Sequence, residues 1–246
     1  MVNFVGAGCG APDLITLRGK RLIEQADVLI YAGSLVNPEL LNYARPECEI
    51  HNSAFMTLEE VISVMERSRE KNVVRLHTGD PSIYGAIREQ MDRLTALGIE
   101  YEICPGVSSF CGVASSLKAE YTLPDVSQTV IITRMAGRTP VPERESIEKL
   151  SAHHATMVIF LSAGMTAELS EKLISGGYSP ETPSAIVYKA TWTDEKIIRC
   201  TVGTLAESAR KYGINKTALI TIGDFLGDDY SLSKLYDANF TTEYRK

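Results

Sequence analysis

The feature that most constrains the fold is an alternation of two kinds of segment along the chain. In the first half, short apolar runs at residues 2–8, 27–33, 73–80 and 100–106 read as strands. Between them, stretches with helical apolar spacing cover residues 13–26, 57–71 and 85–98, and a further helix is expected over 108–118. Such a strand–helix rhythm predicts an α/β fold with a mostly parallel sheet covered by helices on both faces.

The second half repeats this rhythm with one interruption. The polar, proline-containing stretch at 119–128 suggests a boundary, so we expect an N-terminal α/β domain over 1–120 and a C-terminal α/β domain over 121–246. The strands expected at 185–191 and 196–203 are separated only by "WTDE", which is too short for a crossover helix. They should form an antiparallel hairpin, so the second sheet is expected to be mixed. From about residue 228 the chain is polar, and we expect a loose tail.

Composition narrows the function classes. The 246 residues are 44% hydrophobic and carry a net charge of −6, which argues against a nucleic-acid partner bound by general electrostatics. No apolar run approaches the ~20 residues of a membrane span, and no signal peptide is recognisable. We therefore expect a cytoplasmic protein with no membrane partner. The five cysteines and four histidines show no metal-ligand spacing, so no metal site and no structural disulfide are predicted.

Nearly every expected strand ends in small or polar residues, as in "GAGCG", "HTGDPS", "CPGVSS" and "LSAGMT". In open α/β sheets, ligands bind outside the carboxyl ends of the strands. We therefore expect the chemistry along this edge, and a ligand in the cleft between the two domains.

The loop after the first expected strand fits one part of a dinucleotide-binding motif but lacks another. Gly6, Gly8 and Ala11 fit the G-x-G-x-x-A fingerprint, but an acidic residue should follow about 20 residues later, at the end of the second strand. That strand ends in Tyr31, Ala32, Gly33 and Ser34, without an acid. NAD or FAD binding is therefore disfavoured, and a tight turn that needs glycine for steric reasons alone remains open.

Three further loops carry polar side chains. Asp80 follows a buried type of strand, precedes Pro81, and could accept hydrogen bonds from ribose hydroxyls or an ammonium group, or it could simply cap a helix begun by residues 82–85. Ser108 and Ser109 repeat this choice at the next strand end. Arg134 and Arg138 suit carboxylates or phosphates, unless they are solvated surface arginines.

Taken together, "VGAGCGAPDLITLRG", "HTGDPSIYGA", "PGVSS" and the paired α/β domains resemble the tetrapyrrole methylases, a family of S-adenosylmethionine-dependent enzymes. The resemblance runs from residue 2 to about 226. Within the family, "TVIITRMAGRTPVPE" and "VYKATWTDEKIIR" look like the branch that methylates C-11 of precorrin-4 or cobalt-precorrin-4 in corrin (cobalamin) biosynthesis.

The resemblance implies site residues and an assembly. S-adenosylmethionine would contact Cys9, Thr78, Gly79, Asp80, Ile83, Ser108, Ser109, Leu161 and Ala190. The glycine loop, with Gly8 and Asp13, would line the trough for the tetrapyrrole. Because that substrate carries many carboxylates, we add basic residues near strand ends as candidate partners, namely Arg134, Arg138, Arg18 and Lys20. The family also implies a homodimer. No residue is assigned a catalytic proton transfer.

Two departures bear on this reading. The family usually has proline where this chain has Cys9, and the uroporphyrinogen III branch has aspartate where this chain has Ala32. The second departure favours the C-11 branch. The alternatives are methylases acting at other ring carbons (precorrin-2, precorrin-3 or uroporphyrinogen III type), on diphthamide precursors or on ribosomal RNA ribose; an NAD- or flavin-dependent oxidoreductase; and a ligand-binding protein without catalysis.

Overall fold

A computed structural model of the chain describes residues 1–237, 240–241 and 243–245. It contains two compact units, each of which holds one five-stranded sheet. The first unit comprises Met1–Val113 together with Lys189–Glu195, and the second comprises Ala114–Tyr188 together with Lys196–Lys246.

The first sheet is parallel throughout. Its strands are β1 (Val2–Gly6), β2 (Val28–Tyr31), β3 (Glu49–Asn52), β4 (Val73–His77) and β5 (Tyr101–Cys104), in the order β3-β2-β4-β1-β5. The central strands β1 and β4 are buried along their whole length, as expected for a sheet covered on both faces. The predicted parallel α/β architecture is confirmed.

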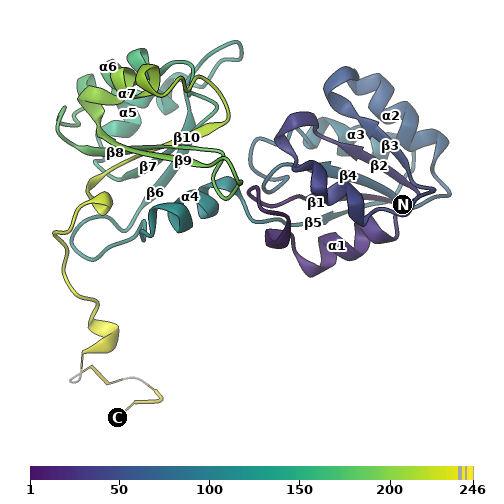
Figure 1. Cartoon of the computed structure of the whole chain (residues 1–246), viewed down its shortest axis with the longest axis horizontal. Helices are drawn as coiled ribbons and strands as arrows, with labels where there is room; N and C mark the ends of the chain where they lie inside the picture. Colours follow the sequence, from purple (N-terminus) through teal and green to yellow (C-terminus); the bar gives the residue numbers. More distant parts are fainter. Residues whose placement is uncertain (238–239, 242, 246) are drawn as a thin grey trace. The chain divides into compact units, whose positions relative to one another are not determined.

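Helices cover both faces of this sheet (Figure 1). They are α1 (Leu17–Glu24), α2 (Leu58–Arg67) and α3 (Arg88–Ala96). The next helix, α4 (Ser109–Leu117), is not one of them, because the chain passes from the first unit to the second within it. Ile23 of α1 packs in one apolar cluster, with Val5 and Leu29 of the sheet. Met65 of α2 and Leu94 of α3 pack in the cluster on the opposite face.

The strand order places a switch point between β1 and β4. The connection from β1 to β2, through α1, runs across one face, whereas the connection from β4 to β5, through α3, runs across the other. The chain therefore leaves the carboxyl ends of these two neighbouring strands in opposite directions. This is the place in an open α/β sheet where a ligand can approach the backbone.

The second sheet is mixed, as predicted. Its strands are β6 (Val130–Arg134), β7 (Thr156–Phe160), β8 (Pro183–Tyr188), β9 (Lys196–Thr201) and β10 (Ala218–Ile222), in the order β6-β7-β10-β8-β9. Only β6 and β7 pair in parallel, and β8 and β9 form the expected antiparallel hairpin. The helices α5 (Ile147–Ser151), α6 (Thr166–Ser175) and α7 (Leu205–Lys211) gather on one face (Figure 1).

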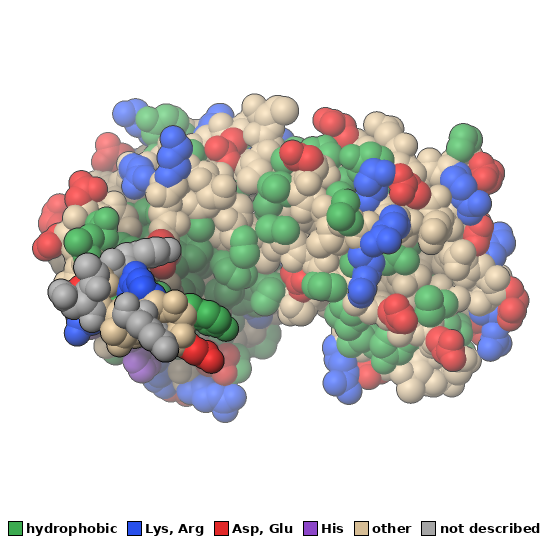
Figure 2. Space-filling model, turned by 90° about the horizontal axis from the view of Figure 1, so that it is seen from below, with side chains coloured by type: hydrophobic (Ala, Val, Ile, Leu, Met, Phe, Trp, Pro, Cys, Tyr) green, Lys and Arg blue, Asp and Glu red, His purple; other side chains and the backbone are tan. Residues whose placement is uncertain are grey.

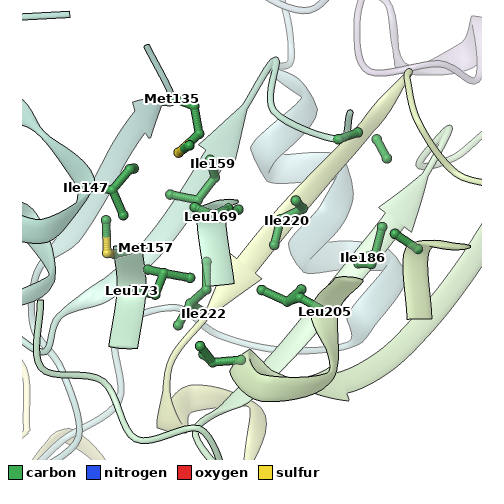
Figure 3. Packing of buried hydrophobic residues seen from close by; sticks show 14 of the residues in the cluster. Met135, Ile147, Met157, Ile159, Leu169, Leu173, Ile186, Leu205, Ile220 and Ile222 are labelled. Carbon is green, nitrogen blue, oxygen red and sulfur yellow. The ribbon is translucent and has the colours of Figure 1, made fainter. Parts of the chain in front are cut away.

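The core of the second unit lies between these helices and the sheet. Leu169 and Leu173 of α6 point toward Met157, Ile159 and Ile222 of the strands, and all are fully buried (Figure 3). Burial of such a side chain stabilises a fold by about 1.5–3 kcal/mol. The helical spacing that predicted α6 thus reflects one apolar face packed on the sheet.

Several predicted boundaries are wrong. The first helix starts at Leu17 instead of residue 13, because Thr16 caps it and Pro12–Leu14 forms a separate 3-10 turn. The helix expected from residues 82–85 starts only at Arg88, because Tyr84 and Ala86 have positive φ angles that no α-helix accepts.

Two more predictions need comment. Strand β3 was missed, because it is a polar edge strand with half-exposed or exposed residues. In the tail expected to be loose from about residue 228, the described residues include one 3-10 turn (Lys234–Tyr236), and residues 238–239, 242 and 246 lie outside the described residues. The domain ranges 1–120 and 121–246 stay a prediction.

No helix in the described part of the chain is both long enough and apolar enough to cross a membrane.

Candidate functional site

The loops that follow β1 and β4 meet through two glycines. The amide of Gly8 donates to the carbonyl of Gly79 (3.3 Å), and the amide of Gly79 donates to the carbonyl of Gly8 (2.9 Å). Both residues have positive φ angles, +82° and +60°, a conformation that favours glycine. The switch point between these two strands is therefore closed by a short backbone ladder that side chains would disturb.

The loop after β5 is packed against the same place. A Cβ atom added to Gly6 would lie 2.5 Å from Cα of Gly106 and 2.6 Å from the carbonyl oxygen of Gly79. Non-bonded contacts this short are essentially never made by a Cβ atom, so both positions need glycine. Three successive strand ends thus come together with only backbone between them.

Asp80 ties the β4 loop to the β5 loop. Its Oδ2 accepts from the amide of Gly106 (2.8 Å), and its Oδ1 accepts from the amide (2.8 Å) and the hydroxyl of Ser82. Partial burial alone would raise the pKa of this carboxyl, but the hydrogen bonds from Ser82 and Gly106 outweigh burial and lower it. Asp80 is therefore an ionised, half-buried carboxylate at the edge of the sheet.

The neighbouring candidates lie around this carboxylate in the fold. Thr78 precedes Gly79 and is half-buried, and the amide of Ile83 donates to the carbonyl of Asp80 (3.2 Å). Ser108 is buried directly before α4, and Ser109 begins that helix. A Cβ on Gly79 would sit 3.4 Å from the amide nitrogen of Ser109, which places the start of α4 beside the glycine ladder.

The glycine loop is also held by the segment Lys189–Glu195, which connects β8 to β9 but belongs to the first unit. Its Thr191 hydroxyl accepts from the amide of Ala11 (3.0 Å) and donates to Sγ of Cys9 (3.7 Å). A Cβ on Gly10 would lie 2.6 Å from both Nε1 of Trp192 and the carbonyl oxygen of Ala190. Ala190 is thus buried against the loop that also contains Cys9.

Cys9 is a buried thiol rather than a solvent-facing one. Burial raises its pKa, although the hydroxyl of Thr191 acts in the opposite direction. A thiol of raised pKa is protonated near neutral pH and is a poor nucleophile. The geometry therefore gives Cys9 a packing role in the loop.

Asp13 and the basic residues of α1 lie beyond this loop. Asp13 is exposed in the Pro12–Leu14 turn, and Arg18 is exposed on α1. Lys20 forms an ion pair with Glu24 and lies 4.9 Å from the ring centroid of Tyr43. On the face drawn in Figure 2, Lys and Arg side chains alternate with Asp and Glu side chains rather than forming one basic area.

The remaining candidates belong to the second unit, where the parallel pair β6 and β7 ends at one edge. Leu161 directly follows β7, is 65% exposed and has a φ of +53°. Arg134 ends β6, and its guanidinium donates to the carbonyl oxygens of Met135 (3.0 Å), Thr139 (3.2 Å) and Pro140 (2.8 Å). Arg134 therefore shapes its own loop, whereas Arg138 is exposed.

The structure thus brings the candidates together in two groups. Within the first unit, the group around the glycine ladder comprises Gly8, Cys9, Thr78, Gly79, Asp80, Ile83, Ser108, Ser109 and Ala190. Within the second unit, Leu161, Arg134 and Arg138 follow the ends of β6 and β7.

Four further residues take part in these contacts and were not predicted to do so. Gly6 was assigned to a tight turn and Gly106 to the end of the segment 100–106, but neither pattern shows that their backbones meet. Thr191 ends the strand expected at 185–191 and Trp192 begins the turn after it, and no local pattern shows that they contact residues near position 10.

Among the described residues, no three metal-ligating side chains gather in a way that could hold an ion. The group in the first unit instead offers the Asp80 carboxylate, the hydroxyls of Thr78, Ser108 and Ser109, and closely packed backbone. Such a set can bind an uncharged or cationic organic ligand through its hydroxyl and amino groups.

Comparison with known proteins identifies the family. The model of the tetrapyrrole (corrin/porphyrin) methylases matches residues 1–206, which include every candidate residue named above. This chain belongs to the tetrapyrrole methylases. The resemblance inferred from the four motifs is therefore confirmed.

Curated members of the family are similar to this tetrapyrrole methylase over its whole length. The cobalt-precorrin-4 C(11)-methyltransferase of Methanocaldococcus jannaschii is 58% identical and is aligned over 100% of this chain and 96% of its own. The protein of the same name from Priestia megaterium is 48% identical over 99% of this chain and 96% of its own. The precorrin-4 C(11)-methyltransferase of Pseudomonas aeruginosa is 41% identical, with 99% and 98% covered.

Solved structures of the family share the fold. The cobalt precorrin-4 methyltransferase CbiF superposes with a TM-score of 0.90 at 48% identity, covering 92% of this chain and 96% of that one. A uroporphyrin-III C-methyltransferase from Thermus thermophilus, solved with S-adenosylhomocysteine, has a TM-score of 0.76 at 25% identity, with 92% of each chain covered.

Proposed function

We propose that this chain transfers a methyl group from S-adenosylmethionine to C-11 of precorrin-4 or cobalt-precorrin-4. The observation that carries the proposal is the 58% identity, over the full chain, to a protein named for this reaction. The motif around Asp80 and the loop of Arg134 and Arg138 lie inside the matched region. Ala32, where the uroporphyrinogen III branch has aspartate, supports the same branch.

The residues of the first unit suit the methyl donor. Gly6, Gly79 and Gly106 allow the strand-end loops to pack backbone against backbone, and Asp80 is an ionised acceptor beside them. Ribose hydroxyls, an ammonium group and a sulfonium are all groups that a carboxylate and nearby serine hydroxyls stabilise. We therefore assign cofactor binding to Asp80 and its neighbours Thr78, Gly79, Ile83, Ser108 and Ser109, with Cys9 and Ala190 beside the glycine loop.

Methyl transfer from S-adenosylmethionine requires little acid–base catalysis by the protein. When bound, S-adenosylmethionine supplies a methyl group already activated on a sulfonium. The chain's residues need to bind, orient and exclude water. Asp80 would orient the donor, and Ile83 would provide apolar surface next to it. Gly8 and Asp13, in the loop bonded to Gly79, would contact the tetrapyrrole.

Substrate charge sets a further requirement. A precorrin carries many carboxylates and this chain has a net charge of −6, so local cations must offset repulsion. Arg134 is bonded to three carbonyl groups of its own loop, so Arg138 is the better candidate for a substrate carboxylate. Replacing Arg138 with alanine should weaken substrate affinity and leave affinity for the donor unchanged. An unchanged substrate affinity would remove Arg138 from the site.

The first test is a calorimetric titration of the purified protein with S-adenosylhomocysteine and, in parallel, with NADH. We expect micromolar binding of S-adenosylhomocysteine alone, lost in Asp80→Ala. Tight NADH binding without a response to the thioether would instead favour the oxidoreductase alternative.

The second test determines the position of methylation. The protein is incubated with the tetrapyrrole substrate and a methyl-labelled donor, and the product is analysed by carbon NMR. Label at C-11 supports the proposal. Label at another ring carbon would assign the chain to a neighbouring branch, and binding without transfer would favour a ligand-binding protein.

We also propose that the enzyme is a cytoplasmic homodimer with domains 1–120 and 121–246, and that Leu161 contacts the donor. The family resemblance supports the homodimer and the Leu161 contact. Light scattering of the purified protein tests the dimer, and S-adenosylhomocysteine affinity of Leu161→Ala tests the contact.

A further inference from the structure

An arginine is buried in the first unit without an acidic partner. Arg75, in the middle of β4, is only 7% exposed, and none of the described carboxylates forms an ion pair with it. Its Nε donates to Oε1 of Gln90 (3.2 Å), and its Nη1 donates to the carbonyl oxygen of Ile30 (3.2 Å). Burial lowers its pKa to about 10, so the guanidinium still carries its charge near neutral pH.

Gln90 connects Arg75 to the backbone just before α3 through hydrogen bonds. It is 5% exposed, and its Nε2 donates to the carbonyl oxygen of Ala86 (3.0 Å). Because arginine has only donors, the amide oxygen of Gln90 must face Arg75 and its NH₂ group must face Ala86. A continuous line of hydrogen bonds therefore runs from the centre of the sheet to the backbone that precedes α3.

The backbone around Ala86, at the end of this series of hydrogen bonds, is strained. Tyr84 and Ala86 have φ angles of +55° and +49°, which side-chain-bearing residues rarely adopt. Between them, a Cβ on Gly85 would lie 2.9 Å from the carbonyl carbon of Pro81, so the turn is tightly closed. Such conformations persist only where surrounding contacts enforce them, and they concentrate at functional sites.

This strained turn is continuous with the candidate cofactor residues. It follows Asp80 directly and contains Ile83, whose amide is bonded to the carbonyl of Asp80. Ser82, which donates to the Asp80 carboxylate twice, is also part of it. Any relaxation of the turn would therefore move the groups that orient and hold that carboxylate.

We propose that Arg75 and Gln90 are positioning residues that hold residues 82–86 in their strained conformation and so set the affinity of the Asp80 loop for the methyl donor. This inference rests on the proposed function. It also gives a reason for the buried charge of Arg75, since a buried charge is in general poor at stabilising a fold.

The test compares variants of Gln90 in the full-length protein. Gln90→Glu keeps an acceptor for Arg75, and adds an opposite charge, but removes the donor to Ala86. Gln90→Met removes both. Arg93→Met, an exposed position on the same helix, is the matched control. Each variant is titrated with S-adenosylhomocysteine, unfolded with urea, and examined by amide hydrogen exchange over residues 82–87.

We expect Gln90→Glu to remain as stable as the parent, to lose protection over residues 82–87, and to bind S-adenosylhomocysteine at least about tenfold more weakly. Arg93→Met should change neither affinity nor exchange. A purely structural role for Gln90 predicts that Gln90→Glu keeps its affinity and its protection, and that result would overturn the inference.

Two other outcomes are also decisive. If Gln90→Met does not fold, Gln90→Glu, which retains the pairing with Arg75, decides the question. If the parent protein does not bind S-adenosylhomocysteine, the proposed function fails, and the exchange of residues 82–87 in Gln90→Glu shows whether the pair holds the turn.

Discussion

The carboxyl edges of the two sheets differ in how tightly their loops are packed. In the first unit, the loops after β1, β4 and β5 meet so closely that Gly6 and Gly106 have no room for a Cβ atom. In the second unit, β6 and β7 are the one pair of neighbouring strands that run parallel. A Cβ atom added to Gly137, in the loop after β6, would meet nothing closer than the Met165 side chain at 3.7 Å.

The difference follows from strand direction. All five strands of a parallel sheet end at the same edge, so neighbouring loops collect there, whereas antiparallel neighbours end at opposite edges. A parallel sheet can therefore build a dense site from short loops distant in sequence. In the mixed sheet, β10 lies between β7 and β8 and runs in the opposite direction, so fewer neighbouring loops share one edge, and Arg134 stabilises the β6 loop by itself.

The largest expected effect comes from placing a methyl group in the crowded edge. Gly106→Ala would put Cβ 2.7 Å from Cα of Gly6 and closer still to the carbonyl oxygen of Gly79, both of them backbone atoms. We expect a loss of about 3 kcal/mol or more in the free energy of unfolding, measured with urea. Gly137→Ala is the matched change at the other edge and should stay within about 0.5 kcal/mol. Similar effects at the two positions would contradict the comparison.

Acid should weaken the first unit through His77. Burial lowers the pKa of this imidazole to about 3, from 6.5, and its Nε2 has no hydrogen-bond partner. The unfolded chain therefore binds a proton below pH 6.5 that the folded chain does not. The contribution of neutral His77 to the free energy of unfolding is fully present above pH 6.5. It is lost as the pH falls toward the pKa of His77 in the folded chain, which is about 3.

Because of His77, the free energy of unfolding should fall by about 1.4 kcal/mol per pH unit, or by about 2 kcal/mol between pH 6.5 and 5. Urea unfolding followed by fluorescence of Trp192, the chain's one tryptophan, measures it. His77→Gln should remove the slope, and His153→Gln, an exposed residue of the second unit, should leave it unchanged. An unchanged slope in His77→Gln would assign the acid sensitivity to other groups.

Asp80→Asn tests the carboxylate that joins two loops of the first unit. Charge-assisted hydrogen bonds from Gly106 and Ser82 are lost or weakened, and we expect a loss of about 1.5 kcal/mol at pH 7. Because the folded pKa lies below the ordinary value of 3.8, this stabilisation is complete above that pH. The difference between parent and variant should shrink as pH falls through the folded pKa. The control is Asp92→Asn, which removes an exposed ion pair with Arg88.

The smallest effect is expected in the second unit. Arg134→Ala removes three exposed or partly exposed hydrogen bonds to loop carbonyls, and we expect a loss of about 1 kcal/mol or less. Thermal unfolding should show a decrease of about 2–4 °C. Arg138→Ala, four residues further in the same loop, should not change the melting temperature. A larger loss at Arg138 than at Arg134 would show that the loop is stabilised differently.

Much of this organisation could be predicted from the chain alone. The parallel-sheet prediction succeeded because short strand-like runs alternate with helical stretches, and the position of polar residues after those runs placed Asp80, Ser108 and Ser109 at one edge. Predictions failed where local pattern and tertiary context disagree. Strand β3 has no apolar pattern because it is an edge strand, and the turn at 82–86 resembles the start of a helix but is strained instead.

By itself, the sequence determined most of the strands and helices, though not β3 or the exact helix starts, that the first sheet is parallel, and that its polar strand ends share an edge. Period and residue type act over a few neighbours and can be read locally. Only the tertiary structure decided that Gly6 faces Gly106, that Thr191 binds Ala11, and that Arg75 reaches Ala86 through Gln90. These contacts depend on the strand order β3-β2-β4-β1-β5 and on the path of Lys189–Glu195 into the first unit. Both result from packing the whole chain, which no short stretch of residues specifies.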